Sequence, residues 1–257
     1  MKEKSAYKPI MITMAGRQKI RRGLLLITFL TFPLTYKYLS PYIIIDGAMQ
    51  GLITGSLIYF TLLFLVSLFF GRAVCGWTCP AAGMQEWSSL IKDKEVKGGK
   101  FNWIKYFIWV PWLGIIIVMT VIAGGFNSIA PFYLIDHGIS VTTSADFIIY
   151  FVVVGLIVIL SLTIGKRAFC HYACWMAPFM IIGTRIKDAV KWPSLHLHSQ
   201  PENCKKCKTC TKNCPMSLPV TEMVLSGNMK NDECILCGTC VDGCPQSVIT
   251  YSWNRPR

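Results

Sequence analysis

Two cysteine runs near the end of the chain constrain its fold more than any other feature of its 257 residues. Residues 204–215 read CKKCKTCTKNCP and residues 234–245 read CILCGTCVDGCP, so both follow the pattern C-x2-C-x2-C-x3-C-P. In this pattern three thiolates of one tight loop bind a 4Fe-4S cluster, and the fourth thiolate binds the cluster of the other run. The tail is therefore predicted to fold around two clusters.

The exchange of the fourth cysteine assigns four ligands to each predicted cluster. Cluster one is expected to be bound by Cys204, Cys207, Cys210 and Cys244. Cluster two is expected to be bound by Cys234, Cys237, Cys240 and Cys214. Two zinc sites or a disulfide-bonded knot are the alternatives, but zinc ribbons use two C-x2-C pairs, and a cytoplasmic tail disfavours disulfides. The tail thus resembles a small α+β ferredoxin domain of the bacterial type, which carries single electrons.

The loop of the first run is strongly basic. It carries Lys205, Lys206, Lys208 and Lys212. Their positive field would favour the reduced form of the cluster beneath them. The same lysines suit a docking surface for an acidic redox partner protein, and a solvated surface is the alternative interpretation.

The rest of the chain is too apolar for one ordinary soluble core, because the sequence is 53% hydrophobic and only 15% charged. Four apolar windows, residues 23–45, 48–70, 106–126 and 147–164, are long enough to cross the roughly 30 Å hydrocarbon core of a bilayer. The first window contains Pro33, Lys37 and Pro41. Its outer half is therefore expected to be a broken helix, with Lys37 reaching the lipid headgroups.

Lysine and arginine predict the orientation of these four helices. The leading segment and the loop after the second window are rich in basic residues, whereas residues 127–146 contain none. Because cytoplasmic loops retain basic residues, we expect a multi-pass protein of a prokaryotic cytoplasmic membrane with both termini in the cytoplasm. The net charge of +13 fits anchoring on anionic lipid. Nucleic acid is not an expected partner, because no soluble basic domain with a nucleic-acid-binding motif remains.

The four remaining cysteines belong to an internal repeat. GRAVCGWTC at residues 71–79 recurs as GKRAFCHYAC at residues 165–174, and an offset of 95 relates Cys75 to Cys170 and Cys79 to Cys174. Each copy follows an apolar window that returns to the cytoplasm, so the two halves form a parallel repeat about an axis along the membrane normal. An amphipathic helix lying along the interface is expected after each pair. Pro80 suits the first position of that helix, which places Cys79 at its N-terminus.

The repeat allows the four paired cysteines (Cys75, Cys79, Cys170 and Cys174) to surround one centre at its axis. Buried packing thiols, a thiol-disulfide switch, zinc and copper are alternatives, and a third 4Fe-4S cluster is favoured by the soft-ligand rule. Such a cluster is anionic and needs compensating charge near lipid. Arg72 and Arg167, three residues before the first cysteine of each pair, are candidates to supply it, or else form a basic flank at the membrane surface.

Three segments follow from these patterns. Residues 1–190 are predicted to form the four-helix membrane domain, and residues 199–257 the two-cluster ferredoxin domain. Residues 191–198 are polar and are predicted to form a linker. His196 and His198 lie in this linker, and solvated histidines are a simpler interpretation than a metal site.

With these motifs the chain resembles the NapH-like membrane ferredoxins, which are related to the membrane part of NosR and to the oxidase-assembly protein CcoG. Members combine C-x3-C-P motifs after transmembrane helices with a two-cluster tail, and the likeness covers nearly the whole chain. Trp175 departs from the pattern, because it stands where proline is expected. The resemblance implies that the chain passes electrons between quinol and a partner iron-sulfur or reductase subunit, as an electron-transfer subunit more than as a stand-alone enzyme.

Three functional hypotheses are compatible with the sequence. In the first, the chain relays electrons between quinol, the paired cysteines and the ferredoxin clusters, and His171 and Glu86 are candidate proton acceptors or ordinary interfacial polar groups. The second is a maturation factor that reduces copper or delivers metal to an oxidase. The third, a transporter, rests on the repeat alone, because the apolar windows lack paired buried charges.

Overall fold

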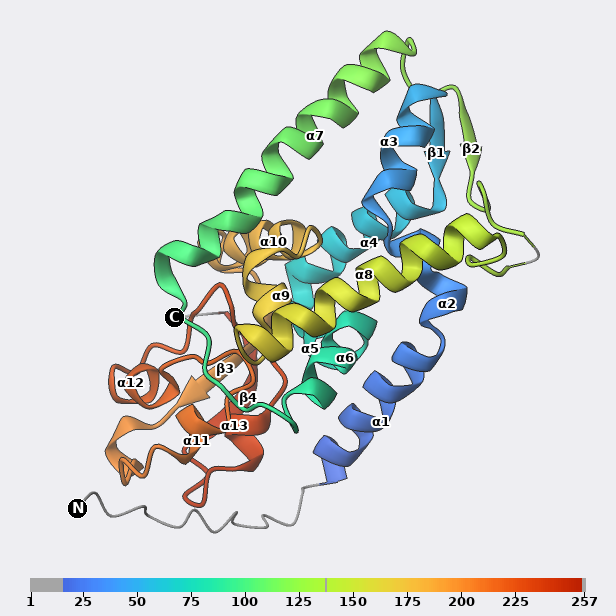
Figure 1. The fold of residues 1–257 in the computed structure, drawn as a ribbon. Helices are drawn as coiled ribbons and strands as arrows, with labels where there is room; N and C mark the ends of the chain where they lie inside the picture. The colour runs from blue at the N-terminus through green and yellow to red at the C-terminus, as the bar shows by residue number, and fades with distance from the viewer. Residues whose placement is uncertain (1–15, 137, 256–257) are drawn as a thin grey trace.

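A computed structural model describes residues 16–136 and 138–255, and the basic residues within 1–15 lie outside the described residues. The part of the chain before the tail is helical: α1 (Gly16–Leu30), α2 (Phe32–Thr35), α3 (Pro41–Met49), α4 (Gly55–Phe70), α5 (Ala73–Trp77), α6 (Pro80–Ser88), α7 (Ile104–Ile122), α8 (Ser144–Thr163), α9 (Ala168–Tyr172) and α10 (Ala177–Ala189). Two short 3-10 helices, η1 (Tyr36–Leu39) and η2 (Gly99–Trp103), precede α3 and α7. Strands β1 (Leu52–Thr54) and β2 (Ser128–Ala130) pair in parallel at the end of the molecule opposite the tail (Figure 1).

Two helices are long and apolar enough to cross a membrane, namely Gly99–Ile122, which joins η2 to α7, and Ser144–Thr163, which is α8. Only 11% of the most apolar stretch of each is buried, so neither is the core helix of a soluble protein. Large apolar side chains such as Phe107, Val121 and Ile148 are exposed along them. Such surfaces suit contact with lipid and support association with a membrane.

The first predicted window is broken in its outer half, as expected, and the second window is not one continuous helix. Within residues 23–45 the chain breaks after Leu30 and again at Ser40, where Pro41 begins α3, because proline has no N–H to continue a helix. Residues 48–70 are interrupted by β1, which leaves α4 as an apolar helix of 16 residues. Lys37 does not reach outward. It is buried and pairs with Asp146 at 3.2 Å.

The repeat is visible in the order of the helices. An apolar helix, a five-residue helix with the first cysteine of a pair, and a packed helix follow one another as α4–α5–α6 and as α8–α9–α10. The offset of 95 relates Ala73–Trp77 to Ala168–Tyr172 residue for residue. The halves also exchange their last helices, because α6 packs against α8 and α10 packs against α4. The repeat therefore holds for the order and packing of the helices, and two helices among the described residues are long enough to cross a membrane.

Helices α6 and α10 lie deeper than the interfacial helices predicted from sequence. Most residues of α6 are buried, including Met84 and Gln85, and α10 buries Met180 and Ile181. Gly183 explains how closely α10 approaches α4, since a Cβ there would lie 1.8 Å from Ser67 Oγ. The prediction of helices laid along the membrane surface is therefore corrected. They face the protein interior, and their exposed edges, such as Trp87, are narrow.

The tail is a small α+β unit at one end of the molecule (Figure 1). It comprises β3 (Ser194–Ser199), η3 (Pro201–Asn203), α11 (Thr209–Lys212), α12 (Val220–Leu225), α13 (Thr239–Asp242) and β4 (Ile249–Asn254). Strands β3 and β4 are antiparallel, with Ser194 opposite Asn254 and Ser199 opposite Ile249. The predicted linker 191–198 is therefore corrected, because most of it belongs to this sheet. The sequence did not reveal β3, since its partner strand lies some 50 residues downstream.

Candidate functional site

The eight cysteines of the tail fall into two groups. One cavity is lined by Cys214, Cys234, Cys237 and Cys240. A second cavity is lined by Cys204, Cys207, Cys210 and Cys244. These are the two sets of four that the spacing predicts, including the exchange of Cys214 and Cys244 between the runs. The metal-ligand roles themselves stay predictions, and the structure shows that each set of four lines one cavity.

The two groups differ in their distance from solvent. Cys214, Cys237 and Cys240 of the second group are buried, whereas Cys207 of the first group is exposed. Lys205, Lys206 and Lys208 are exposed on the same loop as Cys207. The cluster-one cysteines therefore lie beneath a basic outer surface, and the cluster-two cysteines lie toward the rest of the protein.

The four paired cysteines are buried in the helical part, and two contacts relate them by the repeat. Cys75 Sγ lies 3.4 Å from Met180 Sδ on α10, and Gln85 Nε2 on α6 lies 3.1 Å from Cys170 Sγ. The offset of 95 converts one contact into the other, because it relates Cys75 to Cys170 and Gln85 to Met180. Each half of the repeat thus contacts the first cysteine of the other half, as expected when two halves are related by an approximate two-fold axis.

The second cysteine of each pair precedes a helix in a different way. Cys79 is the N-cap of α6 and Pro80 is its first residue, as predicted. Helix α10 instead begins at Ala177, three residues after Cys174, and has proline in its first turn at Pro178. The absence of proline at position 175 thus moves the start of the second helix. Backbone amides near both helix starts hydrogen-bond to the Cys79 and Cys174 sulfurs.

Burial and mutual proximity keep the Cys79 and Cys174 thiols protonated in the metal-free protein. Burial, reinforced by the neighbouring Cys170 and Cys75, raises the pKa of Cys174 to about 12. Burial likewise raises the pKa of Cys79, and the other three paired cysteines contribute. The four thiols are therefore within electrostatic reach of one another, and a bound metal centre would have to displace their protons.

Arg72 and Arg167 are each 1% exposed, so they lie inside the protein and not at the lipid headgroups. Arg167 pairs with Glu86 at 2.7 Å and donates to the Cys75 carbonyl at 3.1 Å. Arg72 pairs at 2.7 Å with Glu233, the residue before Cys234. Among the described residues, Arg167 Nε and Arg72 Nε and Nη2 are buried without a hydrogen-bond partner.

Those unpartnered donors test whether the residues present fit an anionic cluster. An unsatisfied buried N–H costs roughly 1–3 kcal/mol, more when it belongs to a charged group. Burial lowers the pKa of both arginines, but the carboxylates of Glu233 beside Arg72 and of Glu86 beside Arg167 outweigh it, and Cys170 is close enough to both to contribute. A 4Fe-4S cluster on the four thiolates would bring negative charge and sulfur acceptors to these donors. The donor set therefore fits the predicted third cluster.

Within residues 16–136 and 138–255, no three His, Cys, Asp or Glu side chains converge closely enough to hold one metal ion, and this applies to the tail cysteines as well as to the four paired cysteines. A third cluster, zinc and copper therefore stay alternative predictions for the paired cysteines.

Glu86, a candidate proton acceptor, lies in a buried ionic network. It accepts hydrogen bonds from Arg21 of α1 and from Arg167, and Arg22 lies 3.7 Å away. Burial raises the pKa of Glu86, but Arg167 and Arg21 outweigh that effect and bring it to about 2. At neutral pH this residue is a carboxylate that accepts hydrogen bonds.

His171, the other candidate, connects α9 to the tail. Its Nε2 donates to the Met216 carbonyl at 3.1 Å, and its Nδ1 lies 3.0 Å from Asn102 Oδ1. Burial lowers the pKa of His171 to about 4, so the ring is neutral at pH 7. Its visible role is to position the segment after Cys214, and a role as proton acceptor stays a prediction.

The cluster-two segment of the tail contacts both cysteine-bearing helices. On α5, Gly76 lets the Ile235 carbonyl approach so closely that a Cβ would lie 2.4 Å from it. Trp77 Nε1 donates to the Leu236 carbonyl at 3.1 Å. On α9, His171 binds Met216. Cluster two is therefore the tail group that faces the paired cysteines, and cluster one lies beyond it.

Sequence reasoning missed several residues of this arrangement. Glu233 and Lys105 form a buried ion pair beside Arg72, and Arg21 was interpreted only as part of a basic flank. Glu233 carried a weak signal, as an acidic residue directly before a cysteine run. Gln85 and Met180 carried a stronger one, because both lie in register with the repeat.

Comparison with known domain families defines the class of these sites. The family described as 4Fe-4S binding domain matches residues 52–97 and again residues 146–193. The family described as 4Fe-4S dicluster domain matches residues 203–249. The chain therefore carries ferredoxin-type 4Fe-4S binding domains, and the first match falls on both halves of the repeat.

Three relatives are distant in sequence. An uncharacterized protein of Methanocaldococcus jannaschii, MJ0750, is 24% identical over 80% of this chain and 84% of its own length. A second from that organism, MJ0749, is 24% identical over 71% of this chain and 69% of its own length. The Escherichia coli protein named "Putative electron transport protein YccM" is 22% identical over 71% of this chain, and the match covers 52% of that protein.

No solved structure matches the chain. The matched domains and the relationship to YccM together support an iron-sulfur protein of electron transport. They do not distinguish a NapH-like protein from the other groups that share these motifs.

Proposed function

We propose that the protein is a membrane-bound relay that passes electrons between quinol and a redox partner through three 4Fe-4S clusters. The paired cysteines hold the first cluster, Cys214, Cys234, Cys237 and Cys240 hold the next, and Cys204, Cys207, Cys210 and Cys244 hold the outer one. The clusters supply one-electron chemistry. The protein is proposed to lie in the cytoplasmic membrane of a prokaryote, with both termini in the cytoplasm.

The observation that carries this proposal is the contact of the cluster-two segment with α5 and α9. The close approach at Gly76 and Ile235 and the hydrogen bond from His171 to Met216 join the tail to both halves of the repeat. A ferredoxin domain on a flexible tether would need no such contacts. Fixed contacts keep two redox centres at a constant separation, which suits a relay better than a carrier that diffuses between partners.

A small cavity between α1 and α6 is the proposed quinol site. It is lined by Arg22, Leu25, Glu86, Trp87, Ser89 and Leu90. Trp87 and Leu90 are 47% and 69% exposed and face the surroundings of the helices, where a quinol dissolved in lipid would arrive. The Glu86 carboxylate would accept a hydrogen bond from a quinol hydroxyl.

The path from this cavity to the paired cysteines is short. Glu86 pairs with Arg167, which in turn donates to the Cys75 carbonyl. Oxidation of one quinol releases two electrons and two protons. The electrons would leave singly through the clusters, and the protons would pass to water at the cytoplasmic surface. The low pKa of Glu86 suits it to orient the hydroxyl, and not to retain the proton.

The exposed lysines of the cluster-one loop are the proposed docking surface for the partner. Lys205, Lys206 and Lys208 surround the exposed Cys207. A partner with an acidic surface near its own redox centre would be attracted there, and its association rate would fall with rising salt. Membrane lipid is the other proposed partner of the helical part.

Iron and sulfide analysis with electron paramagnetic resonance tests the number of clusters in the detergent-purified protein. We expect about twelve irons per chain. A Cys75→Ser, Cys170→Ser double variant should retain about eight irons and lose one set of signals. Eight irons in both proteins would exclude the third cluster.

Reduction by a quinol analogue tests the relay. We expect cluster reduction without added copper, whereas a maturation factor of the copper-reducing kind would depend on the metal. Ser89→Phe should fill the cavity at Glu86 and raise the KM for the analogue, with the iron content unchanged. Ser226→Phe, at an exposed serine after α12, is the matched control. Equal KM values for the two variants would place the quinol site elsewhere.

A further inference from the structure

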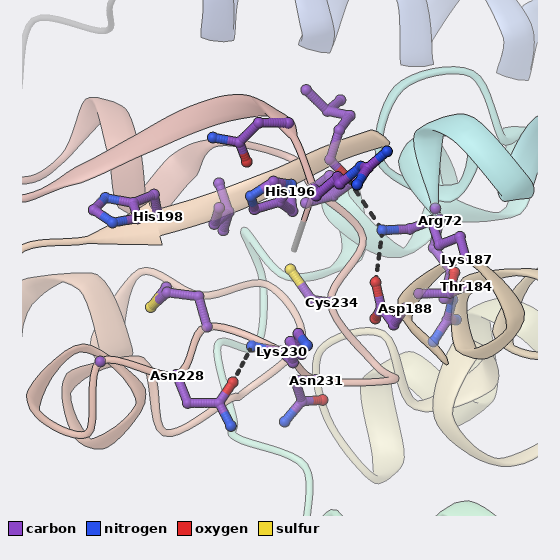
Figure 2. A pocket seen from close by; sticks show the side chains of 18 residues that line it. Arg72, Thr184, Lys187, Asp188, His196, His198, Asn228, Lys230, Asn231 and Cys234 are labelled. Atoms are coloured by element: carbon purple, nitrogen blue, oxygen red, sulfur yellow. Dashed lines mark hydrogen bonds and ion pairs between the residues drawn. The ribbon is translucent and has the colours of Figure 1, made fainter. Parts of the chain in front are cut away.

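A larger cavity lies between the helical part and the tail, and neither the relay nor the domain families account for it. Its volume is about 150 Å³, and it opens to solvent. Figure 2 shows Thr184, Lys187 and Asp188 on one side, His196 and His198 along β3 on another, and Cys234 at its inner wall. The 227–231 loop closes the remaining side.

The lining of this cavity is cationic, although Arg72 is paired with Glu233 outside the lining. It includes Arg72, Lys187, Lys230 and Arg255. The only acidic residue among the lining residues is Asp188, which pairs with Lys187 at 3.0 Å. Lys187 is 4% exposed, and its Nζ is also 3.3 Å from Ser194 Oγ, so one cation is fixed inside the wall. Among the described residues, Lys230 and Arg255 form no ion pair, which leaves their charges for a ligand. An anionic ligand is therefore favoured.

Aromatic side chains place the cavity at the level of a membrane surface. Phe69 and Phe70 end the apolar helix α4 directly before Gly71, which lines the cavity. Phe69 stacks edge to face with Trp192 at 5.5 Å, and Phe70 packs on Trp253 at 5.3 Å. Both tryptophans are about half exposed. Tryptophan is enriched where lipid headgroups meet the hydrocarbon core, and cytoplasmic basic pockets beside membrane helices bind anionic headgroups.

We propose that this cavity binds a phosphate-bearing group, supplied in the membrane by an anionic phospholipid headgroup. Lys230 and Arg255 contact the phosphate at the mouth, and the wall behind them contains Lys187, whose charge is held by Asp188. The acyl chains leave past Trp192 and Trp253 into the bilayer. The lipid source rests on the membrane placement proposed above, whereas the affinity for phosphate does not.

Occupation of the cavity would connect two parts of the relay. Lys187 lies on α10 of the helical part, Lys230 lies in the tail, and Cys234 of the cluster-two group forms part of the same wall. A phosphate group bound by Lys230 would lie between the tail and α10, next to the Lys187–Asp188 pair. The same anion would lie beside cluster two and lower its reduction potential.

Binding to the detergent-purified holoprotein tests the proposal. Short-chain phosphatidylglycerol, short-chain phosphatidylcholine and inorganic phosphate would be titrated separately and followed by calorimetry. We expect phosphatidylglycerol to bind. Lys230→Gln and Arg255→Gln should each weaken it roughly fivefold, and the double variant roughly 25-fold, since one basic residue near such a surface contributes about that factor. Lys206→Gln removes an exposed charge of the same tail away from the cavity and should have no effect.

The outcomes separate the possible sources of the ligand. Tight binding of phosphatidylglycerol alone supports the headgroup, and equally tight, charge-dependent binding of inorganic phosphate supports the phosphate site with a soluble source. Phosphatidylglycerol binding that the double variant leaves unchanged, or no binding of any of the three probes, overturns the proposal. The relay is judged independently, because its iron content and its reduction by quinol do not depend on these probes.

Discussion

Replacing Glu86 by glutamine tests the buried ionic network directly. Arg21 and Arg167 both bind this carboxylate, and together they bring its pKa from the ordinary value of 4.5 to about 2. At 1.36 kcal/mol per pKa unit, the difference corresponds to roughly 3–4 kcal/mol of stability at pH 7. Loss of one partner of a buried pair costs a similar amount, roughly 3–5 kcal/mol.

Thermal unfolding in detergent measures the effect. For a chain of this size 1 kcal/mol shifts the Tm by roughly 2–4 °C, so Glu86→Gln should lower it by about 7–14 °C. Glu95→Gln, at an exposed carboxylate of the following loop, makes the same chemical change outside the network and should shift the Tm very little. Quinol reduction of the surviving protein should be impaired as well.

The pH dependence gives a second check on the same variant. Because the pKa of Glu86 is lowered in the folded protein, its contribution is complete above about pH 4.5 and is lost as the pH falls toward 2. The difference in stability between the native protein and Glu86→Gln should therefore be largest at pH 7, roughly 3–4 kcal/mol, and should shrink as the pH falls below about 4.5. A Tm loss no larger than that of Glu95→Gln, or a difference that grows in acid, would refute the reasoning.

Two further predictions concern the contacts around the cysteines. Gly76→Ala places a Cβ 2.4 Å from the Ile235 carbonyl oxygen and should slow electron transfer to the tail while the iron content is retained. Gly98→Ala, where the nearest atom would lie 3.6 Å from the new Cβ, is the control and should leave the rate unchanged. Equal rates for the two variants in stopped-flow reduction would contradict this prediction. Gln85→Met introduces the residue found at the matching position of the second repeat and removes the amide that contacts Cys170 Sγ. The reduction potential of the third cluster should therefore become more negative in a redox titration. An unchanged potential would count against a cluster there.

Local sequence patterns predicted the features that depend on spacing. The repeat, the N-cap position of Cys79 and the two groups of tail cysteines all follow from intervals of a few residues or from one fixed offset. The two iron-sulfur domain families match these same segments. Such features are encoded where they occur, so they can be recognised without knowing what packs against them.

Features that depend on distant partners were not predicted. Hydropathy could not show that β1 interrupts the second apolar window, because its partner strand lies after α7. For the same reason β3 was interpreted as a linker. A lysine within an apolar window is expected to reach the lipid headgroups, and only the fold brings Asp146 close enough to pair with Lys37 inside the protein. In each case tertiary contacts decided between two local alternatives.

The way in which the repeat departs from symmetry explains how the tail is positioned. The repeat matches Arg72 with Arg167, but the position that matches Glu86 is Ile181, which is fully buried and apolar. One arginine therefore finds its carboxylate inside the helical part, and the other does not. A buried arginine without a counter-charge is costly, so the missing carboxylate must come from elsewhere.

Glu233 of the tail supplies that carboxylate, together with an ion pair to Lys105. Because Glu233 immediately precedes Cys234, satisfying Arg72 also brings the cluster-two loop against α5. A tail rotated to present its cluster-one loop would offer Asn203 at the matching position, which carries no charge to pair with the arginine. The asymmetry in the counter-charges thus selects which end of a nearly symmetric two-cluster domain faces the paired cysteines, and so sets the order of centres along the proposed relay.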